Sequence, residues 1–475
     1  MIIEHINNVN CEKIDLTSFA KSVIDEIKDI NSKIYCFNCV CEDSALKDVQ
    51  IVSKRKKLEK GTLAGLIISV KDNICVKDVE TTAGSKILSG YKPVFNATVV
   101  EKLKMEGAII VGKTSMDEFG FGGFNINTGV DFKVPLNPID LKRSTGGSSG
   151  GSGAVTKVVD FAHVSIAEST GGSIECPASF CGDVGFCPTY GRISRFGLIS
   201  YANSLDKIGI LSKDVEDIIP VFNAVAGKDN KDPTCITDTI KLKKAIAKKK
   251  FKIGIISESF DDYIADYIKE HLRVLINLIK KKHEIFEVSL PFTFKYGVPT
   301  YYIIATSEAS TNLSKFCGLR YGIQADPKTK TFSNFFSEIR SENLGKEAKR
   351  RILLGTYARM AGYRDEYYLK ATKVRRLIID EYKEAFKKYD VLISPTTPMC
   401  APLFSEISKM DVVEQYLFDQ LTVGPNLAGL PHASIPFAKF GEMPLGLMVV
   451  SDHYKEQELI DFLFEIEKVG KENGI

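Results

Sequence analysis

The sequence predicts an α/β fold with a mixed, mostly parallel central sheet flanked by helices on both faces. One observation is a run in which a buried strand (residues 66–70), a helix (98–105) and a second strand (108–111) follow one another. Another is that the same alternation returns after residue 250. A chain of 475 residues with 44% hydrophobic content can also bury a large core, as one large domain or as two to three ordinary ones.

The individual elements follow from the spacing of apolar residues. A helical lead-in is expected over residues 1–60, because its apolar side chains recur at helical spacing, at Phe19, Val23, Ile27 and Ile30. The other predicted elements are strand 34–40, helix 154–159, strand 163–167, strand 253–256, helix 264–280, strand 285–288, helix 368–388, strand 391–394 and a terminal helix from residue 456.

Charge and hydropathy exclude several classes of protein. The 63 basic and 60 acidic residues give a net charge of +3, unlike proteins that bind nucleic acid mainly through its phosphates. The lysine-rich run 241–250 is expected to be the solvated face of a surface helix. Residues 1–10 do not resemble a signal peptide, and no later apolar run approaches the ~18 to 20 residues of a membrane span. We therefore expect a cytoplasmic protein with no membrane contact.

Cysteine and histidine spacing argues against disulfides and metal sites. Eleven cysteines are scattered through a chain without a secretory signal, so reduced thiols are expected. Cys36, Cys39 and Cys41 form a C-x-x-C-x-C cluster, but no second ligand pair or histidine is near it. The six histidines have no H-E-x-x-H spacing. The predicted mechanism uses no metal.

The densest Gly/Ser stretch, residues 143–153, is predicted to be part of a site and not a linker. A helix, a short strand and a second glycine turn at Ser173 follow it closely, whereas linkers separate domains. It lacks the lysine of a nucleotide-binding loop. Residues 146–150 match the G-x-S-x-G pattern of serine hydrolases, but prolines and charged residues stand where that pattern needs a strand.

Three features in order then define a candidate catalytic constellation. Lys71 ends a buried strand, Ser148 lies in the Gly/Ser stretch, and Ser173 lies in the second glycine turn, all within about a hundred residues. A serine hydroxyl needs a base to take its proton before it can attack an amide. A lysine can be that base only as a neutral amine, which burial favours.

These residues resemble the amidase signature family, whose hallmark is a Ser-Ser-Lys triad in a Gly/Ser-rich core. The similar core covers residues 61–213, including 182–198 and 204–209. The resemblance implies that Ser173 is the acyl-enzyme nucleophile, that Ser148 is a relay serine held by a cis peptide bond, and that Lys71 is the general base. It also implies an oxyanion hole made by the backbone N–H groups of Thr170, Gly171, Gly172 and Ser173.

The C-terminal half resembles the glutamine-hydrolysing subunits of tRNA-dependent amidotransferases. The similar stretches are 301–310, 349–356, 394–398, 419–422 and 426–431. With the core they span nearly the whole chain, which implies a single amidase domain over residues 1–475. Its part 214–475 would form the substrate pocket, with Arg351 binding the carboxylate of glutamine, Asp419 its amino group and Tyr301 lining the pocket.

The same resemblance implies an assembly. Ammonia released from glutamine would pass to a tRNA-binding, kinase-like partner subunit, which carries ATP and magnesium and makes most of the tRNA contacts. A small third subunit would complete a heterotrimer, and this chain would bind no cofactor. The product would be Gln-tRNA(Gln) made from Glu-tRNA(Gln), and the use of Asp-tRNA(Asn) stays open. The alternatives are a stand-alone amidase for a small or aryl amide, and a non-catalytic module that binds an anion in its glycine turns.

Three positions beside the nucleophile depart from the family pattern S-D-T-G-G-S-I-R. This chain has Glu168 and Ser169 before Thr170, and Glu175 two residues after Ser173. An acid and a base are both lost, so if they normally pair, neither loss leaves an unpaired charge. Glu175 is nevertheless expected to perturb Lys71 or to repel an anionic ligand. Met448 also departs from the family, since a glutamine is common at its position, and we have no physical account of this difference.

Overall fold

One eleven-stranded sheet forms the centre of the molecule. The computed structural model describes residues 1–56, 59–238, 240–244, 250–326 and 331–472. The strands are β1 (Phe37–Val40), β2 (Ile67–Lys71), β3 (Ile109–Thr114), β4 (His163–Ser169), β5 (Val184–Cys187), β6 (Lys207–Ser212), β7 (Lys252–Ile256), β8 (Glu284–Val288), β9 (Val391–Pro395), β10 (His432–Phe440) and β11 (Met443–Ser451). Their order is β1-β3-β2-β4-β6-β5-β10-β11-β9-β7-β8, so both halves of the chain share one sheet.

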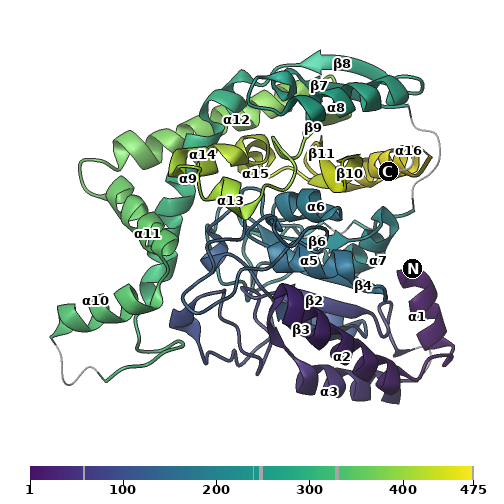
Figure 1. Cartoon of the computed structure of the whole chain (residues 1–475), viewed down its shortest axis with the longest axis vertical. Helices are drawn as coiled ribbons and strands as arrows, with labels where there is room; N and C mark the ends of the chain where they lie inside the picture. The colour runs from purple at the N-terminus through teal and green to yellow at the C-terminus, as the bar shows by residue number, and fades with distance from the viewer. Residues whose placement is uncertain (57–58, 239, 245–249, 327–330, 473–475) are drawn as a thin grey trace.

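Helices surround the sheet, and one group extends away from it. They are α1 (Ile2–Asn10), α2 (Leu16–Ile34), α3 (Glu42–Lys54), α4 (Thr98–Met105), α5 (Gly150–Val158), α6 (Glu175–Cys181), α7 (Val215–Val225), α8 (Asp266–Ile279), α9 (Pro291–Asn312), α10 (Phe332–Asn343), α11 (Lys346–Arg359), α12 (Lys370–Phe386), α13 (Phe404–Ile407), α14 (Val412–Leu417), α15 (Val423–Ala428) and α16 (Glu456–Glu472). Short 3-10 segments include η8 (Phe418–Leu421), and η7 (Asp365–Leu369) is π-helical. Figure 1 shows α10 and α11 projecting at the left of the body.

The sheet is mixed, as predicted, but the prediction that it is mostly parallel is wrong. Among the described strands, four of the ten pairings are parallel: β2 with β3 and with β4, and β7 with β8 and with β9. The middle strands, from β4 through β6, β5, β10 and β11 to β9, pair antiparallel. One source of these pairings is the hairpin of β10 and β11, which has no helix between its two strands. The strand-helix-strand signal therefore held only near the two ends of the sheet.

Helices cover both faces of the sheet, as predicted. Alternate side chains of a strand point to opposite faces, and Ile67 and Ile68 of β2 lie in different buried clusters. The cluster of Ile67 includes side chains from α2, α3 and α5, and the cluster of Ile68 includes side chains from α4 and α7. All five residues of β2 are buried, because neither face of this strand meets solvent.

Most predicted elements are present with small shifts at their ends. The helix at 98–105 has the predicted bounds, and β2, β3, β4, β7, β8, β9, α5, α8, α12 and α16 lie where strands and helices were expected. The helix expected in the lysine-rich run is wrong for its first part, because residues 241–244 have irregular backbone. Residues 245–249 of that run lie outside the described residues. No helix in the described part of the chain is long and apolar enough to cross a membrane.

We expect the sheet core to control stability. Leu447 of β11 is fully buried, so Leu447→Ala should lower the free energy of unfolding by about 2–5 kcal/mol, through lost burial and a residual cavity. Leu353 of α11 is 70% exposed, and Leu353→Ala should change it little. Thermal unfolding of both variants checks this, and equal midpoints would contradict it.

Candidate active site

Neighbouring parallel strands bring the predicted triad together. Lys71 is the last residue of β2, and β4, which pairs parallel with β2, ends at Ser169. The carboxyl ends of parallel strands meet at the same edge of a sheet, so the turn after β4 carries Ser173 towards Lys71. Ser148 approaches from the Gly/Ser loop that precedes α5.

The three side chains form one continuous relay. Nζ of Lys71 lies 2.7 Å from Oγ of Ser148, which lies 2.9 Å from Oγ of Ser173. Lys71 and Ser148 are fully buried, whereas Ser173 keeps 6% of its surface exposed. Both distances are within hydrogen-bond reach, which a proton relay requires. Ser173 is therefore placed to meet a substrate, and the other two to take up its proton.

The Gly/Ser loop adopts the backbone that the resemblance implied. The peptide bond between Gly147 and Ser148 is cis. Asp117 holds the loop, because its backbone N–H donates to the carbonyl oxygen of Ser148 over 3.1 Å. A Cβ atom on Gly147 would lie 2.5 Å from the backbone nitrogen of Asn125, so only glycine fits this approach.

The turn before Ser173 offers backbone donors, though fewer than predicted. The N–H of Ser173 donates to Oγ of Ser169 over 3.0 Å and is therefore engaged, which corrects its assignment to the oxyanion hole. The N–H groups of Thr170, Gly171 and Gly172 have no acceptor among the described residues. A Cβ atom on Gly171 would lie 2.5 Å from Cζ of Tyr301, so glycine is required where the turn meets the pocket wall.

The departures from the family pattern form a hydrogen-bonded set. Ser169 donates to Glu175 over 2.8 Å, and Glu175 also contacts His432, beside which Lys207 lies. Burial alone would raise the pKa of Glu175, but His432 and Lys207 outweigh burial and bring it below its usual value. The two residues that stand in place of the acid and the base, Ser169 and Glu175, are thus joined by a hydrogen bond, and Glu175 has a further partner in His432.

Glu168, and not Glu175, is the acidic residue that contacts Lys71. Oε2 of Glu168 lies 2.9 Å from Nζ of Lys71, and both side chains are at most 1% exposed. The expectation that Glu175 perturbs Lys71 is not supported by any contact between them in the described structure. The sequence did mark Glu168 as unusual, because it departs from the family pattern. Nothing in the sequence indicated that its side chain contacts Lys71.

The three predicted pocket residues lie together around Ser173. Tyr301, Arg351 and Asp419 line one cavity with Ser173, although they come from α9, α11 and η8. The cavity has a volume of about 10 Å³, room for about one water molecule. A larger ligand therefore requires its walls to move apart.

Arg351 is held by partners that the sequence did not reveal. Its Nε donates to Glu347 and its Nη1 to the hydroxyl of Tyr201, each over 2.8 Å, and Tyr416 also donates to Glu347. Nη2 has no acceptor among the described residues. The guanidinium lies over the rings of Phe121, Tyr201, Tyr302 and Tyr416. Arg351 is thereby fixed in place with one donor group to spare.

Asp419 supplies the opposite charge. The hydroxyl of Tyr302, which follows Tyr301 in α9, donates to Oδ2 of Asp419 over 2.7 Å. Burial raises the pKa of Asp419 to about 6, although Tyr302 and Arg351 act against this rise. At neutral pH the pocket therefore presents one carboxylate and one guanidinium. Tyr302 was missed by sequence reasoning, although it adjoins a predicted residue.

One group of side chains has the composition of a metal site. Ligand atoms of Glu175, Cys187 and His432 lie within 4.8 Å of one another, and all three residues are buried. However, Nζ of Lys207 lies 3.4 Å from Nδ1 of His432. A buried ammonium there repels a cation and already balances the charge of Glu175. We interpret the group as a buried polar network.

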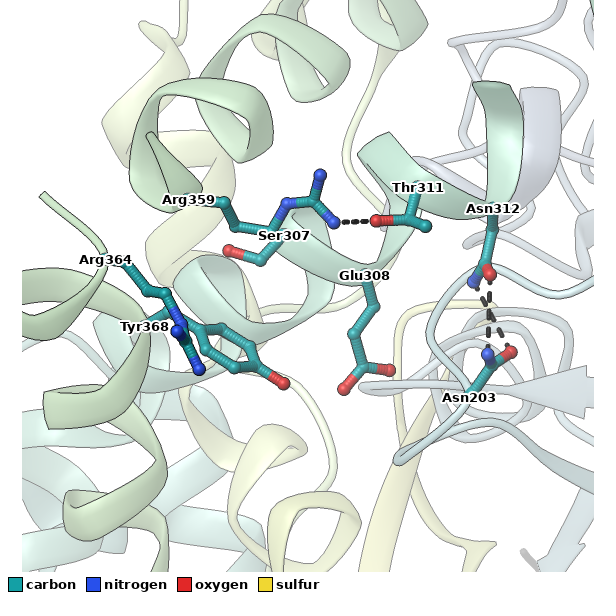
Figure 2. Close-up of a pocket in the computed structure, with 8 residues that line it drawn as sticks. All are labelled: Asn203, Ser307, Glu308, Thr311, Asn312, Arg359, Arg364 and Tyr368. Atoms are coloured by element: carbon teal, nitrogen blue, oxygen red, sulfur yellow. Dashed lines mark hydrogen bonds between the residues drawn. The ribbon is translucent and has the colours of Figure 1, made fainter. Parts of the chain in front are cut away.

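A second cavity, of about 440 Å³, has no triad residue in its lining; Figure 2 shows the residues around it. It is lined by Asn203, Ser307, Glu308, Thr311, Asn312, Arg359, Arg364 and Tyr368. None of the predicted site residues lines it, although it is much the larger of the two. The nucleophile and its relay place the chemistry at the smaller cavity.

Proteins similar to this chain share its full length. The A-type subunit of glutamyl-tRNA(Gln) amidotransferase from Archaeoglobus fulgidus is 44% identical over 452 residues, which cover 95% of this chain and 96% of that protein. The protein of the same name from Thermoanaerobacter pseudethanolicus is 41% identical, covering 97% and 94%. A crystal structure of the same type of subunit from Thermotoga maritima superposes with a TM-score of 0.80 at 32% identity, covering 98% of this chain and 94% of that one.

More distant structures share the fold. A bacterial aryl acylamidase superposes with a TM-score of 0.84 at 20% identity, covering 98% of this chain and 95% of that one. The family model described as Amidase matches residues 19–460, which include the whole relay and the whole pocket. This chain therefore belongs to the amidase signature family.

Proposed function

We propose that this chain is the glutamine-hydrolysing subunit of a tRNA-dependent amidotransferase that converts Glu-tRNA(Gln) to Gln-tRNA(Gln). The observation that carries the proposal is the joint placement of Ser173, Arg351 and Asp419 around one cavity. A free amino acid carries one charge of each sign, and this pocket offers one complementary group for each. The names of the full-length relatives support the same conclusion.

The relay accounts for the chemistry of the first half-reaction. Oγ of Ser173 attacks the side-chain amide carbon of glutamine, while its proton passes to Ser148 and the proton of Ser148 passes to Lys71. The backbone N–H groups of Thr170, Gly171 and Gly172 donate to the oxyanion. Return of the proton through Ser148 to the amide nitrogen breaks the C–N bond and releases ammonia. Water then hydrolyses the γ-glutamyl ester on Ser173.

Arg351 and Asp419 select the substrate. The guanidinium pairs with the α-carboxylate, and Asp419 pairs with the α-ammonium, so the amide end points towards Ser173. A simple aliphatic or aryl amide lacks both charges and leaves two buried groups unpaired, which disfavours its binding. The stand-alone amidase is therefore the second candidate.

The full-length relatives are named as subunits, which implies an enzyme of several chains. Within it, a tRNA-binding, kinase-like partner would hold ATP and magnesium and receive the ammonia, and a small third chain would join the two. This chain would bind no cofactor itself. The net charge of this chain is only +3, which supports the proposal that the kinase-like partner makes most of the contacts with tRNA. We place the assembly in the cytoplasm, where charged tRNA is used.

Ammonia release from glutamine is the direct test of this function. The purified chain with its co-expressed partner subunits should release ammonia faster than the chain alone, and Ser173→Ala should abolish release, because no acyl-enzyme can form. Activity on simple amides but not on glutamine would favour the stand-alone amidase. No activity on any amide, together with an unreactive Ser173, would favour the anion-binding module.

The charge of Asp419 should set the pH dependence of glutamine binding. As pH falls through about 6, Asp419 takes up a proton and loses its attraction for the ammonium, so KM for glutamine should rise. Tyr302→Phe removes a hydrogen bond that lowers this pKa, so the rise in KM should begin at a higher pH. Tyr296→Phe, in the same helix but 37% exposed, is the control. Identical profiles for all three proteins would contradict this assignment.

The relay should also control the reactivity of Ser173 towards a serine-directed phosphonate. Ser148→Ala interrupts the path to Lys71, so labelling should slow by about 10²- to 10⁴-fold. Ser152→Ala is the matched control, because that buried hydroxyl contacts Thr114 instead. Mass spectrometry of the adduct measures the labelling rate of each variant. Equal rates for Ser148→Ala and Ser152→Ala would show that Ser148 takes no part in the mechanism.

A further inference from the structure

The surroundings of Lys71 raise a question of proton supply. Nζ of Lys71 lies 2.7 Å from Oγ of Ser148, 2.9 Å from the carbonyl oxygen of Glu168 and 2.9 Å from Oε2 of Glu168. An ammonium has three protons, and these three oxygens accept all of them. In that state Lys71 has no lone pair with which to take the proton of Ser148. Its third proton must therefore move before each turnover.

Glu168 is the acidic group that can receive this proton without solvent. It contacts Nζ directly, and the two side chains are 1% and 0% exposed. Nδ2 of Asn73 donates to the same oxygen, Oε2, over 3.1 Å, and so holds the carboxylate in position. The nearest proton acceptor of Lys71 is thus built into the protein, and the path to it is a single hydrogen bond.

A second carboxyl group stands behind Glu168. Oγ1 of Thr170 lies 2.5 Å from Oε1 of Glu168 and 2.9 Å from Oδ1 of Asp206. A hydroxyl has one proton and can donate to only one of them at a time, so a protonated Asp206 would donate to Thr170 while Thr170 donates to Glu168. Burial raises the pKa of Asp206 well above its usual range, and the charge of Glu168 adds to the rise. Asp206 therefore holds the shared proton, and Glu168 holds the negative charge.

We propose that Glu168 is the fourth member of the relay and accepts the proton that Lys71 must lose before it can act as a base. This inference rests on the proposed acyl-transfer chemistry and deepens it. In the resting state, neutral Asp206 leaves the hydroxyl of Thr170 free to donate to Glu168, and this hydrogen bond stabilises the negative charge of Glu168. An ionised Asp206 would instead place a second negative charge beside Glu168.

The proton steps balance within the relay. One Nζ–H bond of Lys71 breaks and an O–H bond forms on Oε2 of Glu168, so an ion pair becomes a neutral pair. Rotation about the Cε–Nζ bond then turns the lone pair towards Ser148. The Oγ–H bond of Ser148 breaks as Nζ takes its proton, and Ser148 takes the proton of Ser173. When ammonia leaves, the proton returns through Ser148 to the amide nitrogen, and Glu168 returns its proton to Lys71.

This arrangement has a pH signature. The transfer from Lys71 to Glu168 is internal and changes no net charge, so kcat should be flat across neutral pH. The ionisable groups that face the pair are Asp206 beyond Thr170, Arg195 beyond Asp206, and Asp117 towards Lys71. Without a carboxylate at position 168, Lys71 must lose its proton to solvent. The kcat of such a variant should then rise with pH, because this proton is exchanged with solvent.

The test is to measure kcat of the Glu168→Gln variant in the complex with its partner subunits. Glutamine is kept at saturating concentration, so that the titration of Asp419 does not affect the rate. Compared with the unaltered protein, kcat at pH 7 should fall by about 10²- to 10³-fold and rise with pH, with KM nearly unchanged. Glu456→Gln is the matched control, because Glu456 is also fully buried and pairs with the buried cation Arg192 over 3.1 Å. It contacts none of the relay residues and should keep the flat profile.

Two further readouts make the outcome decisive. Glu168→Asp keeps a carboxylate and should restore the flat profile at reduced kcat, which covers the case in which Glu168→Gln does not fold. The rate of phosphonate labelling of Ser173 tests the same relay without glutamine. If the phosphonate labels the unaltered protein but glutamine is not hydrolysed, the proposed function is wrong. The pH dependence of labelling, compared between the unaltered protein and Glu168→Gln, then still tests the role of Glu168. A flat profile for Glu168→Gln, with kcat within about threefold of the unaltered protein, would overturn the inference.

Discussion

The buried contact between Lys71 and Glu168 is the interaction on which the rest of the site depends. A charge removed from water is strongly destabilising unless it is paired and hydrogen-bonded, and breaking such a pair costs about 3–5 kcal/mol. Lys71 meets this requirement with Glu168 and Ser148, and Glu168 meets it with Asn73 and Thr170. The parallel pairing of β2 with β4 brings these groups together, so a change in the register of these strands would also disrupt the catalytic geometry.

The pocket depends on a second long-range constraint. Arg351 and Asp419 lie in separate helical segments, and each is fixed by hydroxyl groups from other elements, Tyr201 for Arg351 and Tyr302 for Asp419. The two charges are both buried, and Arg351 keeps its charge because Glu347 and four aromatic rings surround it. Once the walls of the cavity have moved apart, two opposite charges, each held by its own partners, can orient a zwitterion with its amide end towards Ser173.

The residues around Ser173 show how a family pattern can change without loss of its architecture. Ser169 accepts a hydrogen bond from the backbone of Ser173 and donates one to Glu175, so it connects the nucleophile to the buried contact of Glu175 with His432. Each altered residue has found a partner, which is the condition for keeping polar groups buried. Met448 pairs with Ser434 and Ser394 in the sheet, and nothing in its surroundings explains why it stands there.

The sequence by itself determined the local elements and the order of the triad. Helical spacing gave α4 its bounds, an apolar run ended at Lys71, and two glycine turns marked Ser148 and Ser173, because these signals lie within a few neighbouring residues. Only the tertiary structure decided the antiparallel middle of the sheet, the partner of Glu168 and the placement of Tyr302 and Glu347. Those features depend on which distant segments pack together, and neither propensity nor motif spacing contains that information.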